Sequence, residues 1–168
     1  TEISNRKWLL YVNSSREFDI GSFKRITEQI EEFENLEFLR LPLYTIVYIH
    51  SDNHYLHFYL DYGPNTAPFH HEKIQIRKRE LPHSSRMTIR GKIGDLDRIL
   101  EPYNFMCIHS RYLLNMNFCE EFTQKTKNIS TAGSGGEVTL GSTDNNSPYY
   151  ESVLKVSRDG AKRLKEKL

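Results

Sequence analysis

The sequence predicts a mostly-β fold, with one domain over residues 41–168 and a helical appendage or linker over residues 1–40. Three observations predict this fold class. Short segments rich in β-branched and aromatic residues recur along the chain, and clusters of Ser, Asn, Asp, Gly and Pro separate them. Apolar residues repeat at helical spacing only in short stretches. The 168 residues are 38% hydrophobic and 27% charged, which is typical of a globular protein rather than a disordered one.

The N-terminal region is predicted to form a short strand and then an amphipathic helix. Residues 7–12 are apolar and indicate a strand, whereas residues 13–21 are turn-rich. From Gly21 to Glu34, apolar residues recur at three- and four-residue steps, at Phe23, Ile26, Ile30 and Phe33. Residues 35–42 indicate a linker that ends at a helix-breaking proline. Because the chain begins with Thr rather than Met, we expect this region to be the remnant of an upstream domain.

Residues 43–168 alternate between strand-like segments and turns, with two short helical patterns. A turn at 51–53 joins the first two strands. Apolar residues at helical spacing predict a helix over 91–101, which Pro102 ends. A second helix follows Ser157, its predicted N-cap. The predicted strands are 43–50, 55–62, 73–80, 86–90, two within 105–120, then 120–127, 136–140 and 149–156.

The segment 105–120 departs from a simple strand pattern. Its second half alternates, with Tyr112, Leu114 and Met116 on one side of an extended chain, which predicts a strand with one buried face. Three hydrogen-bonding side chains interrupt its two apolar runs: His109, Ser110 and Arg111. A core strand has no need of such residues, whereas a surface that binds a polar partner does.

Composition and charge exclude some classes of protein and leave nucleic-acid binding open. The net charge is only +1, but basic residues concentrate at 73–79 and 155–167, and local clusters matter more than sums for phosphate contact. No apolar run approaches the roughly 18 residues of a membrane span, and no secretory signal opens the chain. We therefore expect a cytoplasmic protein without a membrane partner, in which Cys107 and Cys119 are reduced.

A metal site and a catalytic site are the alternatives that the polar residues suggest. Six of the seven histidines lie within residues 50–83, yet His54 and His57 have opposite strand parity and no ligand spacing repeats. His109 beside Ser110 resembles a base beside a nucleophile, but neighbours on a strand point apart. The sequence therefore predicts no metal ligands, no cofactor and no catalytic residues, in a protein that is not an enzyme.

Three motifs in the same order resemble the LytTR (LytR/AlgR-type) DNA-binding domain of bacterial transcriptional and response regulators. Residues 87–122, MTIRGKIGDLDRILEPYNFMCIHSRYLLNMNFCEEF, are similar to the centre of that domain, where a short helix precedes a strand that ends near His-Arg-Ser-Tyr, an aliphatic pair and Asn. Residues 46–59, IVYIHSDNHYLHFY, are similar to its opening hairpin. Residues 154–168, LKVSRDGAKRLKEKL, are similar to its ending.

The resemblance implies a multi-stranded antiparallel β fold whose loops enter successive major grooves of DNA. Base contacts would come from the hairpin tip, from the residue after the motif histidine and from the arginine before the last helix. The residues so implied, with their basic neighbours, are His54, Tyr55, His109, Ser110, Arg111, Lys155, Arg158 and Lys162. The family order is His-Arg-Ser whereas this chain has His-Ser-Arg, which leaves open whether Ser110 or Arg111 meets the DNA.

The resemblance also implies a biological setting. It indicates the output domain of a two-component response regulator, preceded by a receiver domain, that regulates transcription. The implied partners are double-stranded DNA with paired operator half-sites and a second copy in a homodimer. The alternative that the residues leave open is a ligand-sensing or protein-interaction β-module without DNA binding. In that alternative the histidines and the ten tyrosines would line a pocket or an interface.

Overall fold

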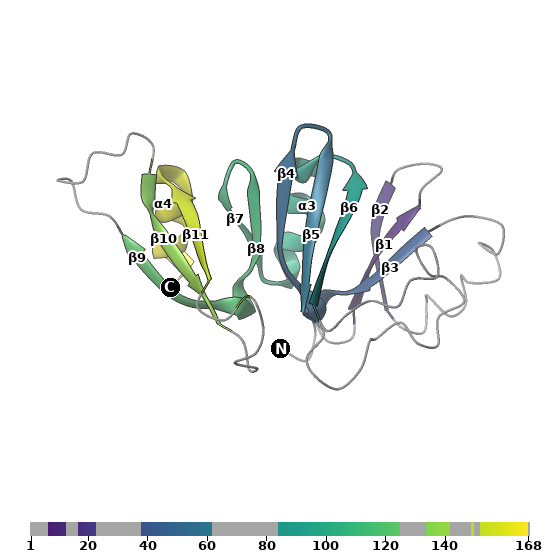
Figure 1. Cartoon of the computed structure of the whole chain (residues 1–168), viewed down its shortest axis with the longest axis horizontal. Helices are drawn as coiled ribbons and strands as arrows, with labels where there is room; N and C mark the ends of the chain where they lie inside the picture. Colours follow the sequence, from purple (N-terminus) through teal and green to yellow (C-terminus); the bar gives the residue numbers. More distant parts are fainter. Residues whose placement is uncertain are drawn as a thin grey trace.

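The protein folds into three antiparallel sheets and two short α-helices, as its computed structural model shows (Figure 1). The structure describes residues 7–12, 17–22, 38–61, 84–124, 134–141, 149 and 152–167. Three sheets follow one another across the molecule, with the strand orders β2-β1-β3, β6-β5-β4-β8-β7 and β11-β10-β9. The prediction of a mostly-β fold with two short helices is therefore confirmed for this part of the chain.

The first two sheets contain β1 (Lys7–Val12), β2 (Glu17–Ser22), β3 (Phe38–Pro42), β4 (Ile46–Asp52), β5 (Tyr55–Asp61), β6 (Ser84–Arg90), β7 (Phe105–His109) and β8 (Tyr112–Asn115). The third sheet contains β9 (Cys119–Gln124), β10 (Ser134–Leu140) and β11 (Val153–Ser157). The α-helices are α3 (Ile93–Leu100) and α4 (Arg158–Lys167), and the short 3-10 turns are Leu43–Thr45, Glu101–Tyr103 and Met116–Phe118.

Most predicted strands are found close to their predicted bounds. The segments predicted at 7–12, 55–62, 86–90 and 136–140 correspond to β1, β5, β6 and β10, and α3 lies within the helix predicted at 91–101. The strand predicted at 43–50 begins only at Ile46, because a 3-10 turn precedes it. The last strand, predicted from residue 149, begins at Val153. The predicted strand 73–80 lies outside the described residues.

The N-terminal sheet is part of the main hydrophobic core. β1 pairs with β2 on one side and with β3 on the other. Its buried side chains pack in one cluster with residues of β4, β5, β8 and α3, and they are Trp8, Leu9, Leu10 and Tyr11. β3 runs across the predicted boundary between residues 40 and 41.

β2 corrects the sequence-based prediction for its segment. The sequence indicated a turn-rich stretch followed by a helix that begins at Gly21, but Glu17–Ser22 is a strand. The reason is tertiary: Phe18 lies opposite Tyr11 of β1, with ring centroids 4.8 Å apart, and packs against the main core. The remainder of the predicted helix, residues 23–34, lies outside the described residues.

The five-stranded sheet carries a different hydrophobic cluster on each face. One face, with Ile49 and Phe58, packs in the cluster that contains α3 and the N-terminal sheet. The other face packs in a cluster with the third sheet and α4, through residues such as Leu114 and Leu164.

Strand β8 lies between the two clusters. Leu113 belongs to the first cluster and Leu114 to the second, and both are fully buried. The prediction of one buried face for this strand was therefore wrong, because core packs on both sides of the sheet at this point. Asn115 is buried as well, and its Nδ2 donates to the Ile46 carbonyl oxygen at 3.0 Å. That bond ties β8 to the start of β4.

The helix α4 begins as predicted. The Gly160 N–H donates to the Ser157 hydroxyl at 3.0 Å, so Ser157 is the N-cap. Gly160 also lies so close to β7 that a Cβ there would collide with the Ile108 carbonyl oxygen. Leu164 of α4 is buried in the second hydrophobic cluster. Within the part of the chain that the structure describes, no helix combines the length and the apolar character needed to cross a membrane.

Candidate functional site

Three segments that are distant in the sequence meet at one edge of the molecule, which we call the turn edge. It consists of the β4–β5 turn (residues 52–55), the β7–β8 turn (residues 109–112) and the start of α4 (residues 157–158). Figure 1 shows the three along the upper margin of the sheets. The Ser51 N–H donates to the Arg111 carbonyl oxygen at 2.8 Å, and this bond joins the two turns. The Ser157 hydroxyl lies 3.4 Å from the Ile108 carbonyl oxygen and joins α4 to β7.

The β4–β5 turn presents two of the predicted DNA-contacting residues. Asn53 adopts a left-handed conformation (φ 56°), which asparagine tolerates better than most residues and which reverses the chain in two residues. The His54 carbonyl oxygen accepts from the Gly91 N–H at 2.9 Å, so backbone atoms hold the turn. The side chains of His54 and Tyr55 remain exposed, Tyr55 at 49%.

The β7–β8 turn is organised by the His109 side chain. The Arg111 N–H donates to His109 Nδ1 at 3.2 Å, and the Ser110 hydroxyl lies 3.4 Å from the same nitrogen. The expectation that His109 and Ser110 point apart was wrong, because Ser110 lies in a turn rather than in a strand. Ser110 and Arg111 are both exposed, whereas His109 is half-buried. His109 therefore positions the turn, and the two residues after it face outward.

The start of α4 and the end of β11 present a group of basic side chains. The six basic residues of this region are all exposed, and they are Lys155, Arg158, Lys162, Arg163, Lys165 and Lys167. Arg158 directly follows the N-cap Ser157 at the turn edge. Lys162 lies one helical turn further along the same face of α4. The other predicted basic cluster, residues 73–79, lies outside the described residues.

A row of polar and aromatic side chains crosses all five strands of the central sheet beside the turn edge. The register pairs Thr88 with His57, His57 with His50, His50 with Tyr112, and Tyr112 with His109. The His50 ring stacks on Tyr112 with centroids 4.9 Å apart, and the centroids of His50 and His57 are 6.0 Å apart.

Sequence reasoning missed this row, although the pairing of two of its five members could have been predicted. A two-residue turn at Asn53 and His54 places His50 opposite His57, since the turn length sets the register of a hairpin. The pairing of β4 with β8, which adds Tyr112 and His109, joins segments about 60 residues apart and has no local signal.

The surroundings of His50 lower its pKa. Burial lowers the pKa of His50, and the neighbouring His57, Arg111 and His109 lower it further, while Asp52 opposes them. The neutral imidazole is therefore favoured beside the turn edge at neutral pH.

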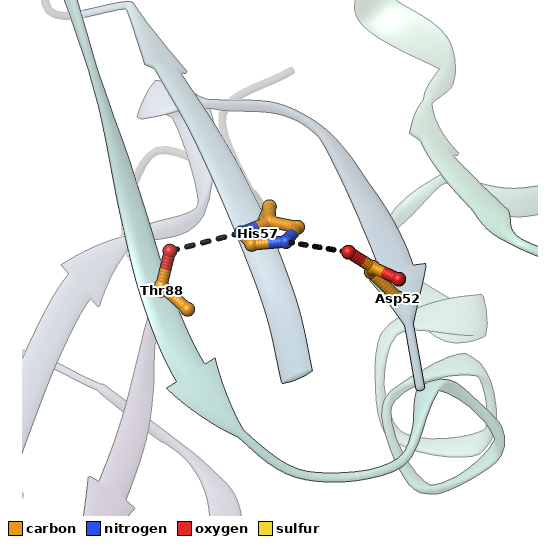
Figure 2. A network of polar contacts seen from close by, with 3 residues as sticks. All are labelled: Asp52, His57 and Thr88. Carbon is orange, nitrogen blue, oxygen red and sulfur yellow. Dashed lines mark hydrogen bonds and ion pairs between the residues drawn. The ribbon is translucent and has the colours of Figure 1, made fainter. Parts of the chain in front are cut away.

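Asp52, His57 and Thr88 form a short polar network (Figure 2). Thr88 Oγ1 lies 2.9 Å from His57 Nδ1, and Asp52 Oδ2 lies 3.7 Å from His57 Nε2. The threonine hydroxyl donates to Nδ1 when that nitrogen carries no hydrogen and accepts from it when it does. The network therefore holds the His57 ring in one orientation in either state. Thr88 itself is exposed on the edge strand β6, in contact with water.

The described residues do not form a metal-binding site. Within that part of the chain, no group of three or more His, Cys, Asp or Glu side chains could hold a metal ion. Cys107 and Cys119 are both free, and burial raises the pKa of each thiol, which disfavours the reactive thiolate.

Comparison with known proteins adds no relative: no protein-family model, curated protein or solved structure matches this chain. The functional proposal below therefore depends on the residues of the turn edge and on the motif resemblance.

Proposed function

We propose that this chain is the sequence-specific DNA-binding domain of a bacterial transcriptional regulator of the LytTR type, whose turn edge faces the major groove. The observation that carries the proposal is the convergence of three segments. The hairpin tip, the turn after His109 and the start of α4 are the three places that the motif resemblance singles out. They are distant in the sequence, yet they lie along one edge with exposed side chains.

The chemistry of these side chains suits a base-reading surface. An arginine guanidinium can donate two hydrogen bonds to O6 and N7 of guanine, and such a contact discriminates by roughly 1–3 kcal/mol. Arg111 and Arg158 are both exposed at the edge. Ser110 and His54 can donate to a base or accept from one. Lys155 and Lys162 would neutralise phosphates, the source of the salt-dependent part of affinity.

The dimensions of the turn edge also fit a groove. β4 and β8 are neighbours and β7 follows β8, so the β4–β5 and β7–β8 turns are about two strand spacings, or ~10 Å, apart. The major groove of B-DNA is about 12 Å wide. Both turns could therefore approach one groove, with the basic start of α4 beside them.

The proposed setting follows from the motif resemblance. The domain would be the output part of a two-component response regulator in the bacterial cytoplasm and would bind paired operator half-sites. Phosphorylation of an upstream receiver domain would then control how two copies occupy the DNA.

The experiment that tests the proposal is selection of bound sequences from a random duplex pool, with the affinity for the selected duplex followed against salt. We expect a recurrent motif and a linear fall of log affinity with log salt concentration. Arg158→Ala should abolish the preference for the selected duplex over a scrambled one, a loss of roughly tenfold or more.

The matched control is Lys165→Ala, an exposed basic residue in the last turn of α4. It should leave the preference unchanged. Circular dichroism should show both variants folded. Failure to enrich any duplex, with no salt-dependent binding, would reject the proposal and favour the interaction-module alternative.

A further inference from the structure

The edge strand β6 ends beside the turn edge, on the side of the sheet opposite to α4. The sheet order places β6 at one margin and β7 at the other, and α4 packs on β7. Arg90 is the last residue of β6 and pairs with Tyr55 at the hairpin tip. Lys92 follows two residues later, at the N-cap of α3. Arg90 and Lys92 are both exposed, and although they lie within the segment 87–122, the motif resemblance implied no DNA contact for either.

Two backbone contacts fix this segment against the turn edge. The Gly91 N–H, between the two basic residues, donates to the His54 carbonyl oxygen at 2.9 Å. The Tyr11 hydroxyl donates to the Arg90 carbonyl oxygen at 3.1 Å. The side chains of Arg90 and Lys92 therefore extend from a backbone segment that hydrogen bonds fix to both the hairpin tip and β1. Side chains at such positions lose less freedom on binding than those on an unsupported loop.

The electrostatic surroundings leave these cations available to an anion. Asp52 at the end of β4 and Asp95 in the first turn of α3 are exposed acids that already lie close to other side chains. Asp52 faces His57 at 3.7 Å, and Asp95 lies 3.8 Å from Arg98. Among the described residues, neither Arg90 nor Lys92 forms an ion pair.

The distance between β6 and β8 indicates that the anion is a DNA phosphate when the β7–β8 turn enters a major groove. β6 is three strand spacings from β8, about 14 Å. Because the major groove is about 12 Å wide, a segment that far from the base-reading turn falls on the phosphate backbone at the border of the groove.

We propose that Arg90 and Lys92 form a further DNA-backbone site that clamps the phosphates on the side of the groove opposite to α4. The inference rests on the proposed function and extends it from base reading to placement of the domain on the duplex. Phosphate contacts fix the register and orientation of a protein on DNA without reading sequence. This site therefore contributes equally to binding of selected and scrambled duplexes.

Arg86 provides a control on the same strand. It has the same strand parity as Arg90 and is also exposed, but it lies four residues further from the turn edge, or about 13 Å along the strand. A backbone site at the turn edge includes Arg90 and excludes Arg86. If positive charge on this strand instead attracted DNA without a defined site, affinity would depend on Arg90 and Arg86 alike.

The test measures the affinity of the full chain for the selected and scrambled duplexes against salt concentration. Arg90→Gln and Lys92→Gln should each weaken binding to both duplexes by the same factor and reduce the log–log salt slope by about 0.9. Arg86→Gln should leave the slope unchanged. Arg90→Lys should restore the wild-type slope, which a purely structural role of the arginine would not predict.

The outcomes separate this inference from the proposed function. An unchanged slope in Arg90→Gln and Lys92→Gln, with wild-type binding intact, would overturn the backbone site alone. An equal loss in Arg86→Gln would overturn it as well, in favour of diffuse attraction. Absence of wild-type binding to any duplex would overturn the proposed function and the backbone site together.

Discussion

The two turns of the turn edge are held in different ways. In the β4–β5 turn, backbone does the holding: Asn53 reverses the chain and the His54 carbonyl oxygen accepts from Gly91. In the β7–β8 turn, the His109 side chain accepts from the Arg111 N–H, and α4 packs behind Ile108. The first turn therefore leaves the side chains of His54 and Tyr55 exposed to a partner. The second uses one side chain and a distant helix to place its neighbours.

This difference predicts where mutations act. Changes in α4 should reach the β7–β8 turn and leave the β4–β5 turn intact. Substitutions that alter the backbone preference of residue 53 should disturb the β4–β5 turn and leave the β7–β8 turn intact. Substitutions in each of the two turns and in α4 can test that contrast.

Gly160→Ala should have the largest effect, because its Cβ would collide with the Ile108 carbonyl oxygen. Separating α4 from β7 should lower the free energy of unfolding by about 3 kcal/mol, at the upper end of the usual cost of overpacking. Urea denaturation measures this loss. The control is Gly94→Ala in α3, where a Cβ meets open space and alanine should stabilise by up to ~1 kcal/mol. Similar losses in both variants would contradict the close approach of α4.

Asn53→Ala should come next. Alanine pays about 1–2 kcal/mol to adopt the left-handed conformation that residue 53 requires. Asn53→Gly should lower the free energy of unfolding by only a few tenths of the loss in Asn53→Ala, since glycine adopts the left-handed conformation without strain. Thermal denaturation of the two variants measures the difference. Equal melting temperatures for the two would show that the β4–β5 turn does not depend on the backbone of this residue.

His109→Ala and His54→Ala should separate a positioning residue from a contacting one. Loss of the His109 acceptor should cost the turn about 1 kcal/mol, so that the Arg111 amide hydrogen exchanges roughly fivefold faster in the free protein. His54→Ala should leave that exchange rate unchanged while it weakens binding to the selected duplex. Amide exchange followed by NMR, beside a binding titration, provides both readouts. Faster Arg111 exchange in His54→Ala would remove the distinction between the two turns.

The smallest effect concerns His50 and pH. Its pKa in the folded chain is lowered, chiefly by burial, from an ordinary value of 6.5. The unfolded chain therefore binds more protons as the pH falls below about 7, and the stability contributed by the neutral ring is lost in that range. His50→Gln and His50→Phe should both show a shallower decline in the free energy of unfolding between pH 7.5 and 5.5. A decline as steep as that of the wild type in both variants would assign the titration to another group.

Several features could be predicted from short segments because their causes are local. Ser157 caps α4 through an N–H three residues away, and the spacing of Leu96 and Leu100 buries one side of α3. The β4–β5 hairpin follows from aromatic and β-branched residues on either side of Asn53. The exposure of Ser110 and Arg111 followed from three polar residues between two apolar runs.

The candidate site itself was predicted in part. Comparison of motifs selected His54, Ser110 and Arg158, and the bounds of the strands and of α4 put these residues in the three segments of the turn edge. Arg90 was not selected, because its relevance depends on where β6 ends relative to the hairpin tip. The positioning role of His109 was missed because the turn geometry that brings Arg111 N–H onto Nδ1 is not visible in a strand pattern.

The fold class, the two helices, the principal hairpin and the residues at its tip could be predicted from the sequence, because each depends on contacts within a few residues. Long-range packing is the reason that β2 is a strand, that β8 is buried on both faces and that the turns and α4 share one edge. These features depend on pairings such as β4 with β8, which join segments about 60 residues apart. A local sequence pattern shows which positions along a segment are apolar. It does not record which distant strand will cover it.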